Sequence, residues 1–279
     1  MQHTRCVPEI IEVELYRRSL EPIVGRRISR VVAPDAWFLK GGIDAAGLRA
    51  ALVGTTVAGL RRRGKLLMID LVAGPVTAAD GGTSTADTVL GLRFGMTGRP
   101  ILDDGDPIMS LLYSSRRQEP AWDRFGLEFE GGGGVRLNDP RRLGGVELDP
   151  DEERLGPDAF TLGLAALRRA LRSRSPVKAV LLDQHRIAGI GNLLGDEILW
   201  RAGIDPARPA EDLDDVEVVR LHRTIRNVLR RQLELGGSHT GRLATAIREH
   251  GAVCPRDGAV LVRRTIGGRT TRSCPVHQR

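Results

Sequence analysis

The chain has 279 residues, of which 41% are hydrophobic and 28% are charged, so its apolar content is sufficient for packed cores. This length suits two modest domains with a small appendage better than one large domain. No window approaches the ~18 uncharged apolar residues of a membrane span, and residues 1–14 lack the apolar stretch of a secretion signal. These features argue against membrane and secreted proteins, and we expect a soluble, cytoplasmic protein.

The charge balance is basic, because 42 Lys and Arg residues against 35 Asp and Glu residues leave a formal net charge of +7. This sign favours a polyanionic partner such as nucleic acid, although the heavy use of arginine also fits the coding preference of a GC-rich genome. The lysines are Lys40, Lys65 and Lys178. Where arginine is the default cation, a lysine indicates a position that needs a compact ammonium group.

Residues 8–24 are predicted to form one helix, with Pro8 in the first turn and an apolar stripe along one face. Short strand-like segments follow as far as residue 148, separated by Gly, Asp and Pro. They cover residues 28–32, 56–60, 66–72, 89–93, 110–113, 126–130 and 135–138. A helix over 45–52 interrupts them, and the Gly-rich stretch 73–88 is predicted as a flexible insert. This region is therefore predicted to be an all-β sandwich or barrel.

The apolar spacing becomes helical after Pro150, and from residue 162 to about 235 it predicts a four-helix unit. The tail 251–279 is too short and polar to hold a core of its own, so it needs a staple. Three cysteines, Cys6, Cys254 and Cys274, are too few for a disulfide scaffold. The spacing of the last two favours a metal as that staple.

The most informative segment is IAGIGNLLGDEILWRAG at residues 187–203, where Gly189, Gly191 and Asn192 form a turn directly ahead of a helix. Such a turn leaves backbone N–H groups free to receive an anion, and a phosphate fits there. A tight helix–helix turn without a ligand explains the same short motif. The sequence around the turn decides between the two.

The run 177–206, VKAVLLDQHRIAGIGNLLGDEILWRAGIDP, resembles the helix-two-turn-helix signature of the formamidopyrimidine-DNA glycosylase and endonuclease VIII family of base-excision repair enzymes. Further pieces resemble family motifs in the family's order: PEIIEVE at 8–14, RRRGKLL at 61–67, LRFGMTG at 92–98, NDPRRLGG at 138–145 and LGPDAF at 155–160. The run from CPRDG to SCPVHQ resembles the family's zinc finger. The similarity spans nearly the whole chain.

The resemblance implies an α+β multidomain fold that binds damaged double-stranded DNA between its first two domains. Its parts are an N-terminal catalytic β-sandwich with flanking helices over 1–148, a linker over 149–161, a helix-two-turn-helix DNA-binding domain over 162–240 and a C-terminal zinc-finger-like β-hairpin module over 241–279. We expect a monomer associated with the nucleoid. An RNA-binding or ribosome-associated module is an alternative that would rest on basicity alone.

The implied activity is that of a bifunctional DNA glycosylase and abasic-site lyase that removes oxidised or ring-opened bases. Pro8 is the implied nucleophile, because a free N-terminal amine with a reference pKa near ~8 is partly neutral at physiological pH and forms a Schiff base. Glu9 is the implied general acid and Glu12 a supporting carboxylate, although both also fit a simple helix N-terminal charge. Lys65 and Arg269 complete the implied catalytic set.

Four residues are implied to contact backbone phosphates: Lys65, Lys178, Asn192 and Arg269. Met96, Arg142 and Leu143 resemble the trio that fills the space left by an extruded nucleotide. A lone Met in a β-segment is more often a core residue, but the flanking glycines favour an exposed turn. Leu143 stands where the family commonly has phenylalanine, so we expect an altered preference for the opposing base.

The N-terminus departs from the family, because seven residues precede Pro8 and a proline inside a chain has an amide nitrogen without an available lone pair. Val7 is what a GTG initiation codon encodes when it is read as internal, so we expect a misassigned start and a mature N-terminus at Pro8. The alternative is a lyase-inactive paralogue that binds damaged DNA and whose extension blocks the proline.

The finger also departs from the family, since Cys254, Asp257, Cys274 and His277 stand where the family has four cysteines. All four are accepted zinc ligands, so we expect one zinc ion, bound more weakly than by four thiolates. The alternative is a hairpin without zinc that presents Arg269 through strand pairing alone.

A third departure is the short stretch SHTGRLATAI at 238–247, which makes oxidised pyrimidines and abasic sites candidates comparable to oxidised purines.

Overall fold

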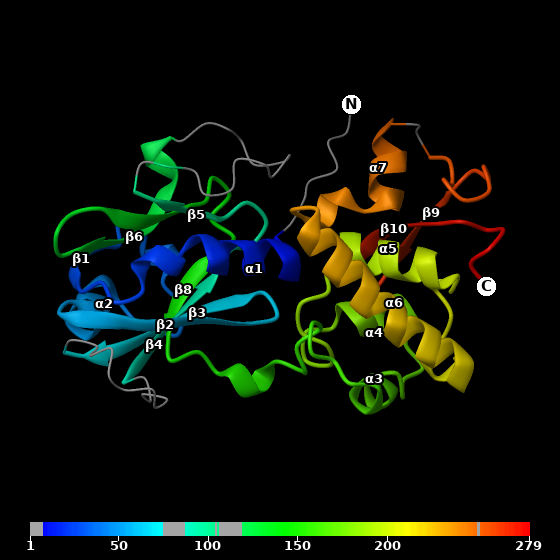
Figure 1. Ribbon diagram of the computed structural model, residues 1–279, viewed down its shortest axis with the longest axis horizontal. Coiled ribbons are helices and arrows are strands. Elements are labelled where there is room, and N and C mark those ends of the chain that lie inside the picture. The colour runs from blue at the N-terminus through cyan, green and yellow to red at the C-terminus, as the bar shows by residue number, and fades with distance from the viewer. Residues whose placement is uncertain (1–7, 75–86, 104, 106–118, 250–251) are drawn as a thin grey trace. The chain divides into compact units, whose positions relative to one another are not determined.

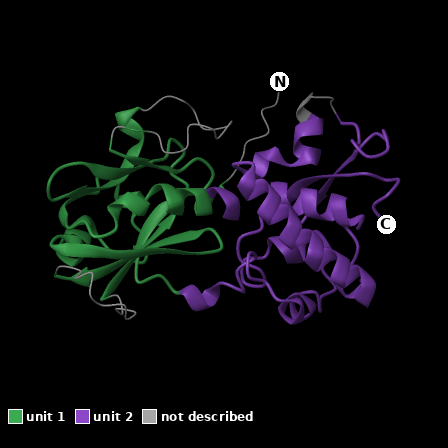
Figure 2. Cartoon of the chain, in the orientation of Figure 1, with its two compact units in different colours: residues 1–8, 13–151 green, residues 9–12, 152–279 purple. Residues whose placement is uncertain are grey.

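The computed structural model describes residues 8–74, 87–103, 105, 119–249 and 252–279. The chain forms two compact units (Figure 2). One holds Pro8 together with Val13–Asp151, and the other holds Glu9–Glu12 together with Glu152–Arg279. The second unit therefore includes a short piece of the N-terminal segment.

The first unit is a β-sandwich of two four-stranded antiparallel sheets (Figure 1), which confirms the predicted fold class for this region. One sheet has the order β1-β6-β7-β5, with β1 at Ile28–Val32, β6 at Asp123–Phe129, β7 at Gly134–Asn138 and β5 at Arg99–Leu102. The other has the order β2-β3-β4-β8, with β2 at Thr55–Arg63, β3 at Leu66–Ala73, β4 at Thr88–Arg93 and β8 at Gly145–Leu148. Helix α2, Ala45–Leu52, has the predicted bounds.

The core of this unit is formed by alternating apolar residues of the strands together with side chains from helix α1, Ile10–Ser19. Val13, Tyr16 and Leu20 from the N-terminal segment are fully buried in it. The helix is shorter than the predicted 8–24, because Pro22 lies in the separate 3-10 turn Glu21–Ile23. A proline in the interior of one continuous helix would remove a backbone hydrogen bond and clash with the preceding turn.

The second unit contains the predicted four-helix region and one further helix. The helices are α3, Leu164–Ala170; α4, Val177–Leu182; α5, Asn192–Ala202; α6, Asp215–Glu234; and α7, Arg242–Glu249. Helix α6 begins with a capping box in which Asp214 and Glu217 satisfy each other's backbone N–H groups. Helix α5 ends at Gly203, whose left-handed conformation satisfies the last carbonyls.

The chain ends in a hairpin of β9, Val262–Ile266, and β10, Arg269–Ser273. Gly267 and Gly268 form its two-residue turn, both at positive φ. Arg269 is therefore the first residue after the turn. The hairpin packs beside α5 in the same unit.

Several expectations need correction or lie outside the described part of the chain. Strands β5 and β8 and helix α7 were not predicted. The predicted strand 110–113 and Cys6 lie outside the described residues, as does most of the predicted insert 73–88. Among the described helices, none combines the length and the apolar content that a membrane crossing requires.

Candidate active site

The Glu9 carboxylate lies at the N-terminus of α5, within the second unit. It accepts hydrogen bonds from the backbone N–H groups of Gly191, Leu193 and Leu194, at 2.8, 2.8 and 3.2 Å. A Cβ atom at position 191 would lie 2.3 Å from the Glu9 carboxyl carbon, so only glycine fits there. The anion that these three N–H groups bind is therefore Glu9 itself, and a phosphate contact at this turn stays a prediction for Asn192.

Glu12 is fully buried and joins two distant pieces of the same unit. One carboxylate oxygen accepts hydrogen bonds from the backbone N–H and the hydroxyl of Ser238, each at 2.7 Å. The other accepts the backbone N–H of Glu9 at 2.9 Å. Burial raises the pKa of the Glu12 carboxyl, and the hydrogen bonds from Ser238 oppose that shift. Nothing in the local sequence pattern indicates the contribution of Ser238.

Lys178, on α4, is completely buried and is held by groups of α5 and the hairpin. Its ammonium lies 2.6 Å from an Asp196 carboxylate oxygen and 2.7 Å from the Thr271 hydroxyl oxygen. Burial lowers the pKa of Lys178 and raises that of Asp196 to about 6, and the attraction between the two charges opposes both shifts. A direct phosphate contact would require the ammonium to leave these partners.

The hairpin is also attached to the first residue of α5. The Asn192 side-chain amide donates to the backbone carbonyl of Thr270 at 3.1 Å. Arg269, the residue just before Thr270 in the hairpin, is exposed. Asn192 and Arg269, which were predicted separately as phosphate contacts, are therefore connected through Thr270.

The first unit holds the remaining predicted residues. Lys65 is half-buried in the turn between β2 and β3. Met96 and Leu143 lie on two loops that meet, since a Cβ atom at Gly95 would lie 2.4 Å from the Leu143 backbone carbon. Leu143 is 51% exposed, which is unusual for a large apolar side chain and suits a wedge.

Arg142, the third member of the predicted trio, makes a two-point ion pair with Asp35. Its guanidinium nitrogens lie 2.7 and 2.6 Å from the two carboxylate oxygens. The Arg142 hydrogen bonds hold the pKa of Asp35 below its usual range, although partial burial opposes this. Arg142 has a positive φ of 57°, so its backbone conformation is constrained as well. Asp35, the partner that orients Arg142, was not predicted from the sequence.

The four predicted metal ligands lie together, with their donor atoms within 4.8 Å of one another. Cys254 Sγ is 3.8 Å from His277 Nδ1, and Cys274 Sγ is 3.3 Å from both carboxylate oxygens of Asp257. Tetrahedral zinc with ligands at ~2.0–2.3 Å spaces its donors by about 3.3–3.8 Å, so these pairs fit. His277 Nδ1 and Asp257 lie 2.6 Å apart and must separate by a fraction of an ångström when a metal binds.

Trp200, on α5, contacts two of these ligands. Its indole N–H donates to Cys254 Sγ at 3.3 Å, and its backbone carbonyl lies 3.2 Å from His277 Nε2. A proton on Nε2 leaves Nδ1 of His277 free to bind a metal. The residues present therefore fit a zinc ion, and the role of Trp200 was not predicted from the sequence.

Two family models match the chain. The N-terminal domain of formamidopyrimidine-DNA glycosylase matches residues 7–146, and the helix-two-turn-helix domain of that enzyme matches residues 148–243. The formamidopyrimidine-DNA glycosylase of Cereibacter sphaeroides is 39% identical over 249 residues, which cover 83% of this chain and 80% of that protein. The Thermus thermophilus enzyme is 34% identical over 294 residues, which cover 98% of each.

Solved structures agree with these relatives. The Lactococcus lactis enzyme in complex with DNA that contains FAPY-dG has a TM-score of 0.77 at 27% identity, covering 97% of this chain and 100% of that chain. Its complex with DNA that contains an abasic site gives 0.77 at 26% identity, covering 98% and 100%. The chain therefore belongs to the formamidopyrimidine-DNA glycosylase family and is a DNA glycosylase and abasic-site lyase of base-excision repair.

Proposed function

We propose that this enzyme uses Pro8 as its nucleophile and that the mature chain begins at this residue. The free secondary amine attacks C1′ of the damaged nucleotide and loses its proton. The base leaves with the electron pair of the glycosidic bond and takes up a proton. Opening of the sugar ring at O4′ then leaves an iminium ion between Pro8 and C1′. Loss of a proton from C2′ expels the 3′-phosphate, which cuts the strand.

Glu9 is the proposed proton carrier: its carboxylate takes up the proton that the Pro8 amine loses and donates it to O4′ when the sugar ring opens. Its carboxylate follows the nucleophile directly in sequence, and three backbone N–H groups of the α5 turn fix its orientation. A fixed acid loses little entropy when the reaction proceeds. Lys65 and Arg269 are the proposed contacts to phosphates near the lesion, and Met96, Arg142 and Leu143 are proposed to fill the vacated space.

Lys178 is proposed to act through the hairpin and not by touching DNA. Its ammonium joins α4, α5 and β10 inside the protein. Asn192 holds the neighbouring residue of the same hairpin. Together these contacts support a role in positioning Arg269.

Oxidised pyrimidines and ring-opened purines in duplex DNA are the proposed substrates. The L. lactis enzyme has been solved with DNA that contains FAPY-dG and with DNA that contains an oxidised pyrimidine. In this chain the stretch after Gly237 is a single 3-10 turn, Ser238–Thr240, followed closely by α7. Ser238 is already bound to Glu12, so this short stretch has few residues that could select one kind of base. It therefore supports a pocket that accepts both kinds.

One zinc ion is the proposed cofactor, held by Cys254, Asp257, Cys274 and His277. When bound, the metal supplies a cross-link between the two ends of the finger. This cross-link supports the hairpin that carries Arg269, as expected for a segment too small to hold its own core.

The observation that carries the proposed mechanism is the Glu9 carboxylate fixed at the α5 N-terminus, on the residue that follows Pro8. Mass spectrometry of the native protein, combined with strand cleavage of duplexes that contain each lesion, tests it. We expect Pro8 as the first residue and products of β-elimination. Cleavage by protein that verifiably retains residues 1–7 would exclude Pro8 as the amine. Retention with tight binding and no cleavage would support the lyase-inactive alternative.

A further inference from the structure

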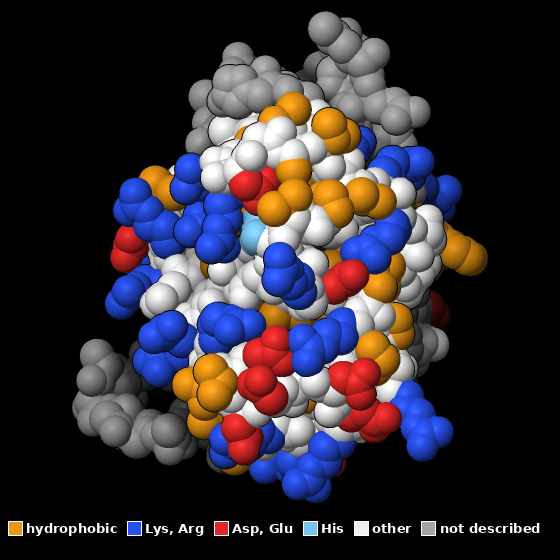
Figure 3. Space-filling view, turned by 90° about the vertical axis from the view of Figure 1, so that its right-hand side faces the viewer, with side chains coloured by type: hydrophobic (Ala, Val, Ile, Leu, Met, Phe, Trp, Pro, Cys, Tyr) orange, Lys and Arg blue, Asp and Glu red, His pale blue; other side chains and the backbone are white. Residues whose placement is uncertain are grey.

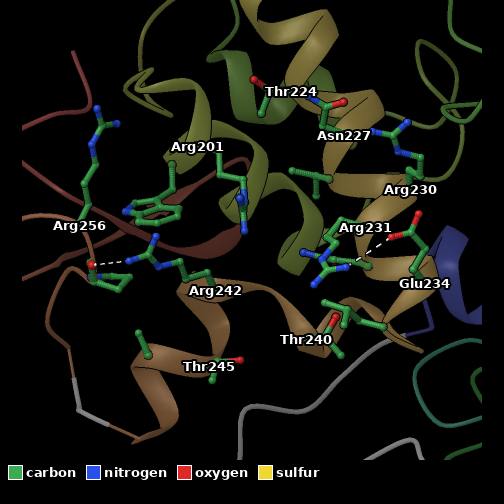
Figure 4. A pocket seen from close by; sticks show the side chains of 16 residues that line it. Arg201, Thr224, Asn227, Arg230, Arg231, Glu234, Thr240, Arg242, Thr245 and Arg256 are labelled. Atoms are coloured by element: carbon green, nitrogen blue, oxygen red, sulfur yellow. Dashed lines mark hydrogen bonds and ion pairs between the residues drawn. The ribbon is translucent and has the colours of Figure 1, made fainter.

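A groove with a volume of about 1030 Å³ lies within the second unit. Its walls come from the last turn of α5, one face of α6, the start of α7 and the finger residues Pro255 and Arg256 (Figure 4). None of its lining residues is a proposed catalytic residue, phosphate contact, space-filling residue or metal ligand, and Thr240 alone comes from the turn Ser238–Thr240 that is proposed to border the damaged base. The groove is therefore a surface that the glycosylase reaction leaves unexplained.

The groove is strongly positive. Five arginines line it against one acid, Glu234, so five positive charges less one negative leave +4: Arg201, Arg230, Arg231, Arg242 and Arg256. Figure 4 shows Arg201, Arg231 and Arg242 on three different helices around the groove, with Arg231 paired with Glu234 and Arg242 bonded to the Pro255 carbonyl. On the face of the molecule shown in Figure 3, Lys and Arg side chains also cover more of the surface than Asp and Glu do. A concave surface of one sign concentrates ligands of the opposite sign.

The arginines are partly fixed in position before any ligand binds. The guanidinium carbons of Arg201 and Arg242 lie 6.0 and 5.9 Å from the centre of the Trp200 ring. Arg242 also donates to the backbone carbonyl of Pro255 at 3.1 Å. Arg201 Nε is paired with the Glu197 carboxylate at 2.6 Å, which fixes this side chain but offsets part of its charge. The remaining donors of these guanidinium groups can bind an anion, and ordering them in advance lowers the entropy cost of doing so.

Gln232 provides a second, independent sign of a ligand. It lines the groove and is only 3% exposed, yet neither its amide nitrogen nor its amide oxygen has a hydrogen-bond partner among the described residues. Buried amides in native proteins are nearly always hydrogen-bonded. A ligand with both a donor and an acceptor would satisfy this side chain.

We propose that the groove binds one strand of nucleic acid, in addition to the lesion-containing duplex: its phosphates pair with the arginines, and its bases provide the donor and the acceptor for Gln232. Arginine guanidinium groups pair with phosphate through two parallel hydrogen bonds, and Asn and Thr side chains are common phosphate contacts. Asn227, Thr240 and Thr245 provide such groups beside the arginines. The volume of about 1030 Å³ lies at the upper end of the ~300–1,000 Å³ range of small-molecule pockets, so several nucleotides of an extended strand would fit along it.

An acidic protein partner fits this surface less well. Interfaces between proteins depend on a few large apolar or aromatic anchors in a dry centre. Trp200 is the aromatic residue of the groove, and it is 3% exposed because it packs against the finger. A strand that contacts arginines and amides needs no such anchor.

The test uses the full chain with its lesion-binding surface saturated by unlabelled duplex that holds a non-cleavable abasic analogue. A labelled single strand of about 12 nucleotides is then titrated, and its fluorescence anisotropy is followed at two salt concentrations. The variant Arg230→Glu/Arg231→Glu is compared with Arg223→Glu/Arg226→Glu, which changes the net charge equally. All four arginines are exposed on α6, but Arg223 and Arg226 do not line the groove.

We expect the strand to bind the saturated protein. The groove variant Arg230→Glu/Arg231→Glu should weaken strand affinity at least about tenfold. It should also lower the slope of log affinity against log salt concentration by about 1.4, for two ionic contacts. The control variant should change affinity less than about twofold. Competition by single-stranded DNA or by undamaged duplex supports the proposal, and their relative strengths identify the source of the strand. Equal loss in both variants, no binding to saturated protein, or equal competition by polyglutamate would overturn it.

Gln232→Met provides a further measurement that does not depend on charge. Because the amide has no partner among the described residues, its removal should leave the melting temperature unchanged or raise it. Strand binding should weaken. A lower melting temperature would show that Gln232 bonds within the fold and would remove it from the site.

Discussion

Three backbone N–H groups of the α5 turn donate to the Glu9 carboxylate, and this geometry restricts what can replace it. Glutamine has the same shape but turns an NH2 group toward donors, so at least one N–H loses its acceptor. We predict that Glu9→Gln lowers the free energy of unfolding by roughly 1–3 kcal/mol and slows strand cleavage at least about 100-fold. Urea unfolding and single-turnover cleavage measure the two effects.

A matched control is Glu21→Gln, since Glu21 is exposed and pairs only with Arg17 among the described residues. Its effect on stability should stay within about 0.5 kcal/mol, as for other surface ion pairs. If Glu9→Gln were as stable as this control, the assignment of Glu9 as the anion at the α5 N-terminus would be wrong.

The ion pair between Asp35 and Arg142 provides a prediction about the opposing base. Asp35→Asn removes the charge that orients the Arg142 guanidinium, so we expect discrimination between opposing bases to fall several-fold. Binding to undamaged duplex should change less than about twofold. Cleavage rates on duplexes that differ only in the opposing base provide the measurement, and unchanged discrimination would separate Arg142 from this role.

The same pair has a defined pH dependence. Because Arg142 depresses the pKa of Asp35 below the reference value of 3.8, the pair stabilises the fold above that pH. The contribution is lost as the pH falls through the depressed pKa. In Asp35→Asn, the free energy of unfolding should therefore fall less steeply as the pH drops below 3.8. Its slope against pH near neutrality should not change.

At the scale of the elements, the buried ion pair of Lys178 and Asp196 joins α4, α5 and the hairpin. Burial raises the pKa of Asp196 from 3.8 to about 6. A raised pKa means that this carboxyl's stabilising contribution is complete below 3.8 and is lost as the pH rises through about 6. The ion pair thus holds the hairpin in place, while the burial of Asp196 lowers the free energy of unfolding near neutral pH.

Lys178→Met leaves Asp196 buried without its counter-charge. We predict a loss of about 3–5 kcal/mol of unfolding free energy near pH 7, and a smaller loss near pH 4, where Asp196 is protonated. Urea unfolding at the two pH values measures both losses. An equal loss at both would show that the effect comes from packing of the lysine stem and not from the ion pair.

The elements that sequence periodicity predicts well are those with a continuous apolar pattern. Helix α2 has the predicted bounds, and most strands of the sandwich differ by a few residues at their ends. Strand β5 was missed because its residues, RPIL, begin with an arginine and a proline, and its burial comes from pairing with β7. Helix α7 was missed because it follows the Gly-rich stretch at 236–241, which was treated as one loop with it.

The candidate site was predictable only where a motif is local. The motifs located the turn at Gly189–Asn192, but its anion comes from Glu9, which is 182 residues from Gly191 in sequence. Asp35 and Ser238 were missed for the same reason, since their partners Arg142 and Glu12 are distant in the chain. The finger ligands were predicted because their spacing is itself the signal, whereas Trp200 belongs to another element.

At the scale of the whole molecule, the proposed zinc site predicts a link between metal binding and DNA binding. Chelation should release about one equivalent of zinc and weaken binding to lesion duplex at least about tenfold, because Arg269 loses its fixed position. Asp257→Cys should hold zinc more tightly and leave DNA binding unchanged. Metal analysis alongside fluorescence anisotropy provides the measurement. Metal-free protein that binds lesion duplex at full strength would remove zinc from the finger.

The most direct test of the proposed chemistry is reductive trapping. Borohydride converts an iminium between protein and abasic DNA into a stable amine, so protein that begins at Pro8 should form a covalent complex. Peptide mass spectrometry should locate the adduct on Pro8. Protein with a verified Met1 N-terminus should form none, because its Pro8 nitrogen is an amide. Equal trapping of both proteins, or an adduct on Lys65, would contradict Pro8 as the nucleophile.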